Sequence, residues 1–541
     1  MNAELLLKHF DRMSEAPDAV PRLRQFVLGL AVQGRLVPQQ PTDEPASELL
    51  IRIRTWRKAA ESQGKARPPK KPLRAVEEEE FPYQLPQGWS WARLGELIYI
   101  HSGDGLTSES MRRGDIPVFG GNGVTGYHDT PNIHRPTVVI GRVGYYCGSI
   151  HVTPAQAWVT DNAFITEFAS DAILPEFLVR LLEATNLKEN EGATAQPVIS
   201  GSKIYPIAVG LPPRAEQHRI VAKVAELMKL SDQLETAQAE RERRRDRLAA
   251  ASLHRLNHPA DAADPELFRA HARFYINHLP RLTTRPDQVK QLRQTILNLA
   301  VRGKLVGQIP GDKPPNELKY LDPARRESSF PIPPSWRWTT IQKLGLLRGG
   351  GTPSKARSEF WSGHIPWISP KDMKRPYIDS SIDHISSQAV KESTAKLIDE
   401  GSVLFVVRGM ILAHSFPVAI CKLPVTVNQD MKTLTLHIPI MNEFVLRAMM
   451  GLKPIILAKV LRSSHGTCRI ESDAYENILF PVPPLSEQER IVAKVDELMA
   501  LCHLVETHIE TAQTEGHQLL ESILRTALIS DRPTVELQWN T

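Results

Sequence analysis

The 541-residue chain has little cysteine and no long apolar run. Four cysteines (Cys147, Cys421, Cys468 and Cys502) lie far apart and form no C-x-x-C pair, which argues against a disulfide framework and a zinc ribbon. No stretch of eighteen apolar residues occurs, and the N-terminus carries early acids without the apolar core of a signal peptide. We therefore expect no membrane span and a cytoplasmic location.

Sequence motifs of the common catalytic classes are missing too. The chain contains no [DN]-P-P-[FYW] segment, no G-x-x-x-x-G-K-[ST] loop, no H-E-x-x-H and no G-x-S-x-G, and its eighteen histidines show no ligand spacing. These patterns would mark an amino-methyltransferase, a nucleotide-driven motor, a metalloprotease or a serine hydrolase. We expect no catalytic residue, metal or cofactor in this chain. The formal charge of +5 permits a polyanionic partner without requiring one.

What the sequence has instead is duplication. The phrase PPRAEQHRIVAKVAELMKL (212–230) returns at 483–501 with fourteen of nineteen residues identical, and LRQFVLGLAVQGRLVPQ (23–39) returns at 292–308 with eleven of seventeen identical. LPQGWSW (85–91) returns as IPPSWRW (332–338). The stretches between these phrases differ in length and in almost every residue. This order predicts a duplicated frame that holds two unlike inserts.

Both copies of the first phrase are expected to begin long helices. Pro484 precedes Ser486 and Glu489, a capping-box spacing that places a helix start near Leu485. Apolar residues then recur every three or four positions for more than four heptads, which favours a coiled coil over the alternative, a helix on a globular core. We predict an antiparallel pair. The residues assigned to this coiled coil are Ile220, Val224, Leu227, Leu234, Ile491, Val495, Leu498, Val505 and Ile509.

The first helix turns polar at AERERRRDRL (239–248). This stretch is either a solvated helix face, the safer interpretation, or a basic face for a phosphate backbone.

The two inserts are expected to form short strands, because runs at 137–152 and 401–428 are rich in β-branched and aromatic residues. Each run contains one arginine, Arg142 or Arg408. A charge among buried strand residues is costly unless it is paired or aimed at a ligand, so a structural salt bridge and a ligand contact are both open.

Polar glycine-rich loops follow both Trp-x-Trp phrases. In the second insert, glycines, hydroxyls and cations (347–374) alternate with Trp361 and Trp367; the first insert has a looser counterpart at 101–127. Phosphate and base contacts use this mixture of donors, cations and flat faces.

Taken together, LAVQGRLV/LAVRGKLV, GWSW/SWRW, GGTPS…FWSGHIPW and the repeated PP..EQ.RIVAKV.EL resemble the specificity subunits of type I restriction–modification systems. The resemblance spans nearly the whole chain. It implies an α+β protein with two mixed α/β target recognition domains, separated by two long helices in an antiparallel coiled coil with a pseudo-two-fold internal repeat. The first insert departs from the pattern, with SGDGLTS in place of the GGTPS opening, which puts its early loop contacts in doubt.

The resemblance also implies a division of the chain. A helical region and linker (1–80) precede the first recognition domain (81–210); a central helical region (211–308), a linker (309–331), the second recognition domain (332–482) and a C-terminal helical region (483–541) follow. Late loops at 192–204 and 462–470 are expected to approach DNA. The candidate DNA contacts are Arg112, Arg113, Asn122, Tyr127, Arg142, Gln196, Lys203, Gly350, Thr352, Ser354, Lys355, Arg357, Lys371, Arg408, Arg462 and Ser463.

By the same resemblance, the chain is a non-catalytic reader of a bipartite, asymmetric site in double-stranded DNA. Its expected partners are two copies of the methyltransferase subunit and the restriction subunits, which would hold S-adenosylmethionine, Mg²⁺ and ATP. Two other functions stay open at this point: a self-sufficient modification enzyme with an unrecognised active site, and a coiled-coil scaffold that binds only protein.

Overall fold

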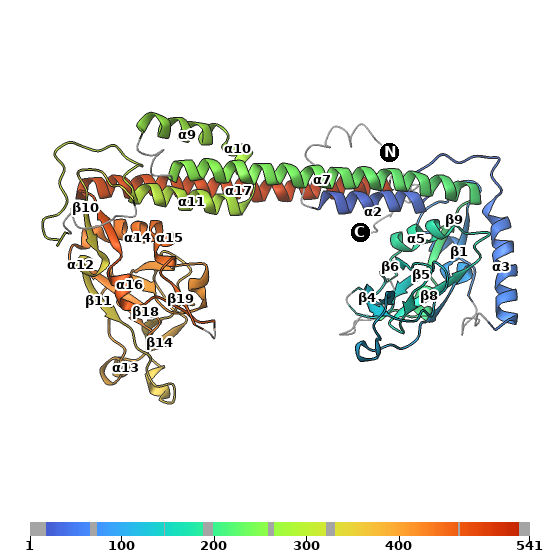
Figure 1. The fold of residues 1–541 in the computed structure, drawn as a ribbon, viewed down its shortest axis with the longest axis horizontal. Coiled ribbons are helices and arrows are strands. Elements are labelled where there is room, and N and C mark those ends of the chain that lie inside the picture. Colours follow the sequence, from blue (N-terminus) through green and yellow to red (C-terminus); the bar gives the residue numbers. More distant parts are fainter. Residues whose placement is uncertain are drawn as a thin grey trace, which may run out of the picture. The chain divides into compact units, whose positions relative to one another are not determined.

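The structure, a computed structural model, describes residues 18–64, 73–144, 146–187, 198–257, 264–320, 330–463 and 466–529. The fold is mixed α/β (Figure 1). The chain divides into two compact units, Met1–Glu240 with Gln513–Thr541, and Arg241–Ala512. In the described ranges no helix is both long and apolar enough to cross a bilayer.

The described residues of the first unit's insert form three small sheets. Its main sheet has the order β2-β8-β5-β6 (Ile98–Ser102, Ala163–Phe168, Val138–Gly141 and Ile150–Val152). A second has the order β4-β3-β7 (Gly123–His128, Ile116–Gly120 and Trp158–Val159), and β1 (Ser90–Arg93) pairs with β9 (Ala208–Leu211). Helix α5 (Pro175–Ala184) buries Phe177 and Leu181 in the core formed with these strands. The strands predicted within 137–152 are confirmed.

The insert of the second unit repeats this plan with longer connections. The main sheet has the order β11-β18-β15-β16-β13 (Gly345–Gly349, Met431–Leu436, Val403–Val406, Val418–Cys421 and Tyr377–Ile378). Beside it lie β14-β12-β17 (Asp383–Ile385, Ile365–Ile368 and Thr426–Val427), the pair β10-β21 (Arg337–Thr340 and Leu479–Val482) and the hairpin β19-β20 (Leu461–Arg462 and Cys468–Arg469). In each insert a two-residue strand comes just before the last strand of the main sheet, β7 before β8 and β17 before β18. This short strand pairs in parallel, β7 with β3 and β17 with β12. Inserts that differ in sequence therefore share a strand plan.

Two long helices carry the repeated phrase. They are α7 (Arg214–Asn257) and α17 (Leu485–Ile529), so the start predicted near Leu485 is confirmed. The predicted capping box is wrong: the backbone N–H groups of Glu487 and Gln488 both donate to Pro484 O. Ser486 lies inside the helix, and its hydroxyl donates to Asp312 Oδ2 at 2.6 Å.

The predicted heptad positions define the buried face of each long helix. Ile220 and Val224 are fully buried in the core of the first unit, and Ile491 and Val495 in that of the second. These first turns therefore lie on a globular core, which was the alternative to a coiled coil. Later positions are half-buried: Leu227, Leu234, Leu498, Val505 and Ile509.

A shorter helix packs beside the long ones in each unit. In the first unit, Arg24 of α2 (Ala19–Val32) donates to Asp232 and Glu235 of α7 at 2.6 and 2.7 Å. In the second unit, α11 (Pro286–Val301) lies beside α17 (Figure 1), and Arg293 of α11 donates to Glu506 of α17 at 2.7 Å. Arg293 and Glu506 occupy the repeat positions of Arg24 and Glu235. The duplicated frame therefore repeats this ion pair as well as its amino-acid sequence.

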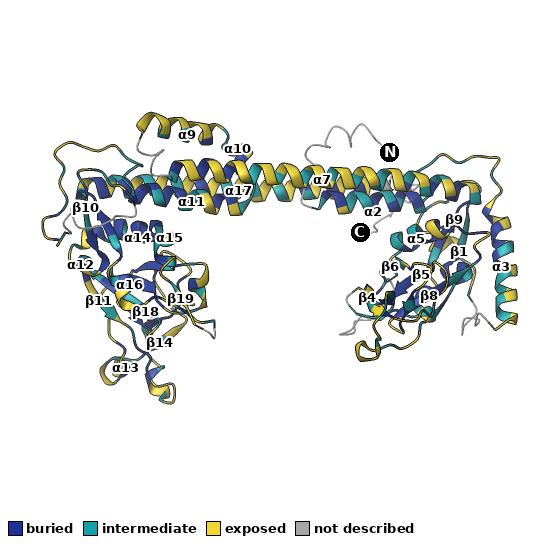
Figure 2. Ribbon diagram, in the orientation of Figure 1, coloured by how far each residue is buried: buried dark blue, intermediate teal, exposed yellow. Residues whose placement is uncertain are grey.

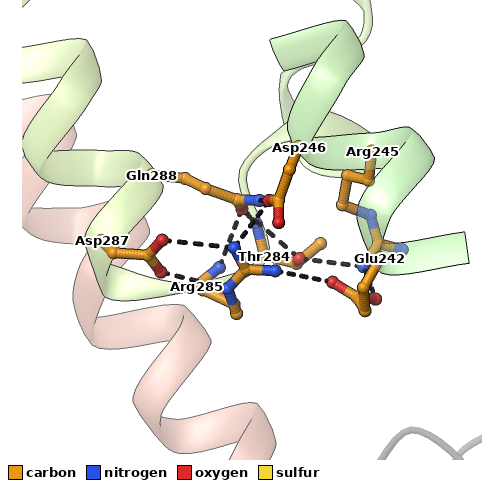
Figure 3. Close-up of polar contacts among 7 residues, drawn as sticks. All are labelled: Glu242, Arg245, Asp246, Thr284, Arg285, Asp287 and Gln288. Atoms are coloured by element: carbon orange, nitrogen blue, oxygen red, sulfur yellow. Dashed lines mark hydrogen bonds and ion pairs between the residues drawn. The ribbon is translucent and has the colours of Figure 1, made fainter. Parts of the chain in front are cut away.

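The polar stretch 239–248 has a structural role in the second unit. Arg285, which precedes α11, donates to Glu242 Oε2 at 2.8 Å, to Asp246 Oδ1 at 2.6 Å and to Asp287 Oδ1 at 3.1 Å (Figure 3). Arg245 Nη1 donates to Thr284 Oγ1 at 3.1 Å in the same cluster. Part of the stretch is thus neither a free basic face nor simply solvated, because its polar residues hold the start of α11.

Beyond this cluster the buried face of α7 continues one residue later than a strict heptad would place it. Leu248 is 47% exposed, while Ala249, Leu253 and Leu256 are buried against Tyr275 of α9 (Pro265–Asn277). The outer face of α9 is exposed (Figure 2).

Candidate nucleic-acid interface

In the second insert, the predicted glycine loop lies against a tight turn. A Cβ on Gly350 would lie 2.0 Å from Asn428 O, so the backbones meet at a distance that only glycine allows. Gly351 N donates to Val427 O at 2.9 Å, and the Thr352 hydroxyl donates to Gln429 Oε1. Gly350 and Thr352 are therefore placed on the turn that joins β17 to β18.

Arg408 lies beside this turn. It follows β15, is exposed, and its backbone N–H donates to Asp430 O at 3.1 Å. No carboxylate pairs with its side chain among the described residues, so the structural salt bridge considered from the sequence does not form there. Gly409 N donates to Cys468 O at 2.9 Å. The backbones of Arg408 and Arg469 form an isolated antiparallel β-bridge. The fold thus brings Arg408 to the hairpin that carries Arg462 and Ser463.

In the first insert, Arg142 has a different environment. Its Nη1 donates to Ser102 Oγ at 3.0 Å and to Asp161 O at 3.3 Å, and its guanidinium lies 5.4 Å from the Phe164 ring centre. Again no carboxylate pairs with it in the described part of the chain. Neutral groups therefore accept from Nη1, whereas Nε is buried without a hydrogen-bond partner among the described residues.

Arg142 and Arg408 are not equivalent in register, although both interrupt an apolar run. Gly141 pairs with Ala163 in one sheet, and Val406 pairs with Met431 in the other. Arg142 follows Gly141 directly, whereas Arg408 comes two residues after Val406. When the two sheets are aligned on these pairs, Arg408 therefore lies one residue later along its strand than Arg142 does.

The other predicted contacts of the first insert fall into three groups. Arg113, Asn122 and Tyr127 are exposed around the β3–β4 hairpin, Tyr127 to 59%. Arg112 is held by Asp129 through hydrogen bonds of 2.8 and 2.9 Å, which lower the pKa of that carboxyl. Lys203 Nζ donates to Val198 O at 2.9 Å. Gln196 lies outside the described residues.

In the second insert, several predicted residues are used within the protein. Arg357 donates to Glu359 and Glu392 at 2.6 and 2.8 Å and lies over the Phe360 ring. Trp367 is buried and donates to Gly351 O, so its ring is not one of the exposed flat faces that a DNA contact would use.

The remaining cations of that insert are more open. Ser354 and Lys355 are exposed. Lys371 is exposed as well, and it lines a hollow of about 600 Å³ together with Lys374 and Lys453.

Sequence reasoning missed the residues that fasten each insert to its long helix. Trp89 Nε1 donates to Glu216 Oε2 at 3.0 Å, and Gln39 Nε2 donates to Glu216 Oε1 at 3.1 Å. In the second unit, Ser335 of the insert donates to Gln308 Oε1 at 2.8 Å, and Gln308 Nε2 donates to Glu487 Oε1 at 2.6 Å. Burial raises the pKa of both carboxyls. The one sequence signal for these groups is the Glu-Gln pair that is identical in both copies of the duplicated phrase. A buried carboxylate needs fixed partners, which is a reason for the pair to be kept in both copies.

Comparison with known proteins assigns a family to this chain. The family described as "Type I restriction modification DNA specificity domain" matches residues 86–241 and 333–513. The type I restriction enzyme EcoAI specificity subunit of Escherichia coli is 27% identical over 549 residues, which covers 92% of each chain. The EcoEI specificity subunit of the same organism is 30% identical over 60% of this chain and 62% of its own.

Among solved structures, a chain from a study of complex assembly and conformational transition of the type I R-M system aligns with a TM-score of 0.51 and 20% identity, covering 83% of this chain and 100% of that one. This likeness concerns the fold. Domain, relatives and fold together define a protein of the DNA-recognition class. The chain belongs to the family of specificity subunits of type I restriction–modification systems.

Proposed function

We propose that this chain reads a bipartite, asymmetric DNA sequence, one half-site with residues 81–210 and the other with residues 332–482. The helical regions 1–80, 211–308 and 483–541 would hold the two domains apart, with 309–331 as a linker. In this proposal α7 and α17 pair as an antiparallel coiled coil about a pseudo-two-fold axis.

The observation that carries the proposal is a common strand plan with different exposed side chains. In both inserts a positive charge without a carboxylate partner among the described residues, Arg142 or Arg408, lies at the turn before the last strand of the main sheet. Arginine is the commonest side chain in specific base contacts. Since these two arginines leave the backbone at different positions, the two half-sites should differ in sequence.

The proposed DNA contacts are those predicted from the sequence, weighted by their surroundings. Arg113, Asn122, Tyr127, Lys355, Lys371 and Arg462 are exposed and available. Arg112 and Arg357 would have to exchange a carboxylate for a phosphate, which favours a positioning contact with the DNA backbone.

Docking of methyltransferase subunits is supported by a repeated exposed stripe on the long helices. Ala222, Glu226 and Leu230 of α7 are exposed, and the same residue types are exposed at the repeat positions on α17. Leu230 is 53% exposed, and its counterpart Leu501 is 51% exposed. Packing does not explain identity at exposed positions, whereas one partner bound twice does. Restriction subunits would join this complex, and S-adenosylmethionine, Mg²⁺ and ATP would bind to the partners.

Selection from a random duplex pool at moderate salt tests the reading function. The chain, co-expressed with the methyltransferase subunits of its own system, should enrich one sequence with two separated specific blocks. Deletion of one heptad from α17 should change the gap between the blocks and leave the blocks themselves unchanged. Enrichment of no sequence would refute the proposal and favour a protein scaffold. Stoichiometric binding of S-adenosylmethionine by the isolated chain would instead indicate an enzyme.

Substitution of single leucines tests the docking surface. Leu230→Asp and Leu501→Asp should each remove one of two methyltransferase subunits, as measured by native mass spectrometry. Leu504→Asp is the matched control, because Leu504 is 55% exposed on α17 but its repeat position on α7 is Gln233. Loss of a subunit in the control variant alone would place the docking face elsewhere.

A further inference from the structure

Two turns, residues 160–163 before β8 and residues 428–431 before β18, have the same architecture in the two inserts. In the first, Ala163 N donates to Thr160 O at 3.1 Å, and in the second Met431 N donates to Asn428 O at 3.3 Å. The first residue of each turn is buried, Thr160 to 4% exposure and Asn428 to 5%.

The buried side chain also fixes the turn from within. Thr160 Oγ1 accepts a hydrogen bond from Asn162 N at 3.3 Å, and Asn428 Oδ1 accepts one from Asp430 N at 3.1 Å. Side-chain acceptors of this kind hold a turn in one conformation. The second residue of each turn therefore projects from a rigid support.

That projecting residue is Asp161 in the first insert and Gln429 in the second. Both are exposed. The Asp161 carboxylate has no cation partner within the described residues, although Arg142 Nη1 donates to its backbone carbonyl at 3.3 Å. The Gln429 amide accepts from Thr352 at Oε1, which leaves its Nε2 donors and a second lone pair of Oε1 free.

The chemistry of these two side chains suits base edges and not phosphates. A carboxylate is repelled by the DNA backbone, but it accepts a hydrogen bond from the N4 amine of cytosine in the major groove. A glutamine amide pairs with both N6 and N7 of adenine. The arginine beside each turn supplies the positive charge that brings the duplex close.

We propose that Asp161 and Gln429 are equivalent base-reading residues, Asp161 selecting a cytosine in the first half-site and Gln429 an adenine in the second. This inference rests on the proposed reading function and adds the residues and base types through which it acts. It also gives a physical reason for the asymmetry of the target, since one turn position carries two different hydrogen-bonding patterns.

Isosteric exchanges test the inference without disturbing the turns, because the fixing bonds come from Thr160 and Asn428. In the methyltransferase complex, Asp161→Asn should replace cytosine by adenine at one position of the first half-site in a duplex selection. Gln429→Glu should replace adenine by cytosine at one position of the second. The change in relative affinity between the two bases should be about 5- to 150-fold.

Asp171→Asn and Gln342→Glu are the controls. They make the same chemical changes at exposed positions away from the turns, and they should leave the selected sequence unaltered. Unchanged bases in both half-sites of the turn variants would overturn the inference. So would a uniform loss of affinity with a changed salt dependence, which is the behaviour of a phosphate contact. A wild-type complex that selects no bipartite sequence would refute the proposed function itself.

Discussion

Replacement of Trp89 by phenylalanine should weaken the attachment of the first insert to α7. The indole N–H donates to Glu216 at 3.0 Å, and Glu216 is only 1% exposed. A hydrogen bond to a charged group contributes about 1.5–3 kcal/mol, and its loss leaves a buried carboxylate undersatisfied. The loss of local stability should appear where the insert joins the helix, at the β1–β9 strand pair.

The chain supplies its own control in the second unit. Trp336 lies beside Glu487, but its N–H makes no hydrogen bond of normal geometry among the described residues. Trp336→Phe removes a similar ring volume and no hydrogen bond, so it should cost less than Trp89→Phe by about 1.5–3 kcal/mol.

Hydrogen exchange is the suitable assay, because a chain with two units has no single free energy of unfolding. Amides of β1 and β9 should exchange about 10- to 150-fold faster in Trp89→Phe, beyond any effect of Trp336→Phe on β10 and β21. Equal acceleration in the two variants would show that ring packing, and not the hydrogen bond, fastens the inserts.

Three further predictions concern charge. Burial raises the pKa of Glu216 and Glu487 above 4.5, so the folded chain holds these protons more tightly; the resulting stabilisation is present below about pH 4.5 and is lost as pH rises through the raised pKa. The double Gln variant should flatten thermal stability across that window, and an unchanged profile would contradict this. Arg408→Ala should cost about 1–3 kcal/mol in gel-shift binding through the second half-site only; equal loss at both half-sites, or unfolding, would make it structural. Arg285→Ala should speed amide exchange at the start of α11, with a stability loss of about 1 kcal/mol because the pairs are partly solvated, while Arg269→Ala, in an exposed pair, should not.

The sequence predicted the frame well because the frame is written twice. Identity between the two halves located both long helices, and the spacing of apolar residues identified their buried faces. It could not identify what covers those faces: Ile491 and Val495 pack into a domain core, and a heptad pattern is the same whether the partner is a helix or a sheet. The prediction that Ser486 caps the helix was wrong because the helix begins before Ser486. The backbone carbonyl of Pro484 already accepts the first helical N–H groups.

The interface was less predictable because it depends on register within the inserts. Composition marked Arg142 and Arg408 correctly as unusual, but only the strand pairing shows that they occupy successive positions. No pattern in the sequence marks Gln429. It lies in a polar triplet that resembles an ordinary loop until the buried Asn428 beneath it and the Thr352 hydroxyl beside it are seen.

The residues that fasten each insert to its long helix are separate from the residues proposed to read bases, so the frame can stay constant while the inserts vary. Glu216 is held by Trp89 and Gln39, both outside the turn that presents Asp161. Gln429 is supported by Thr352 and Asn428, neither of which contacts Glu487 in the described structure. A substitution at either turn therefore leaves the attachment of its domain unchanged. If Asp161 and Gln429 read bases as proposed, the base selected at a half-site can change through one side chain, while the contacts that set the position of the domain stay as they are.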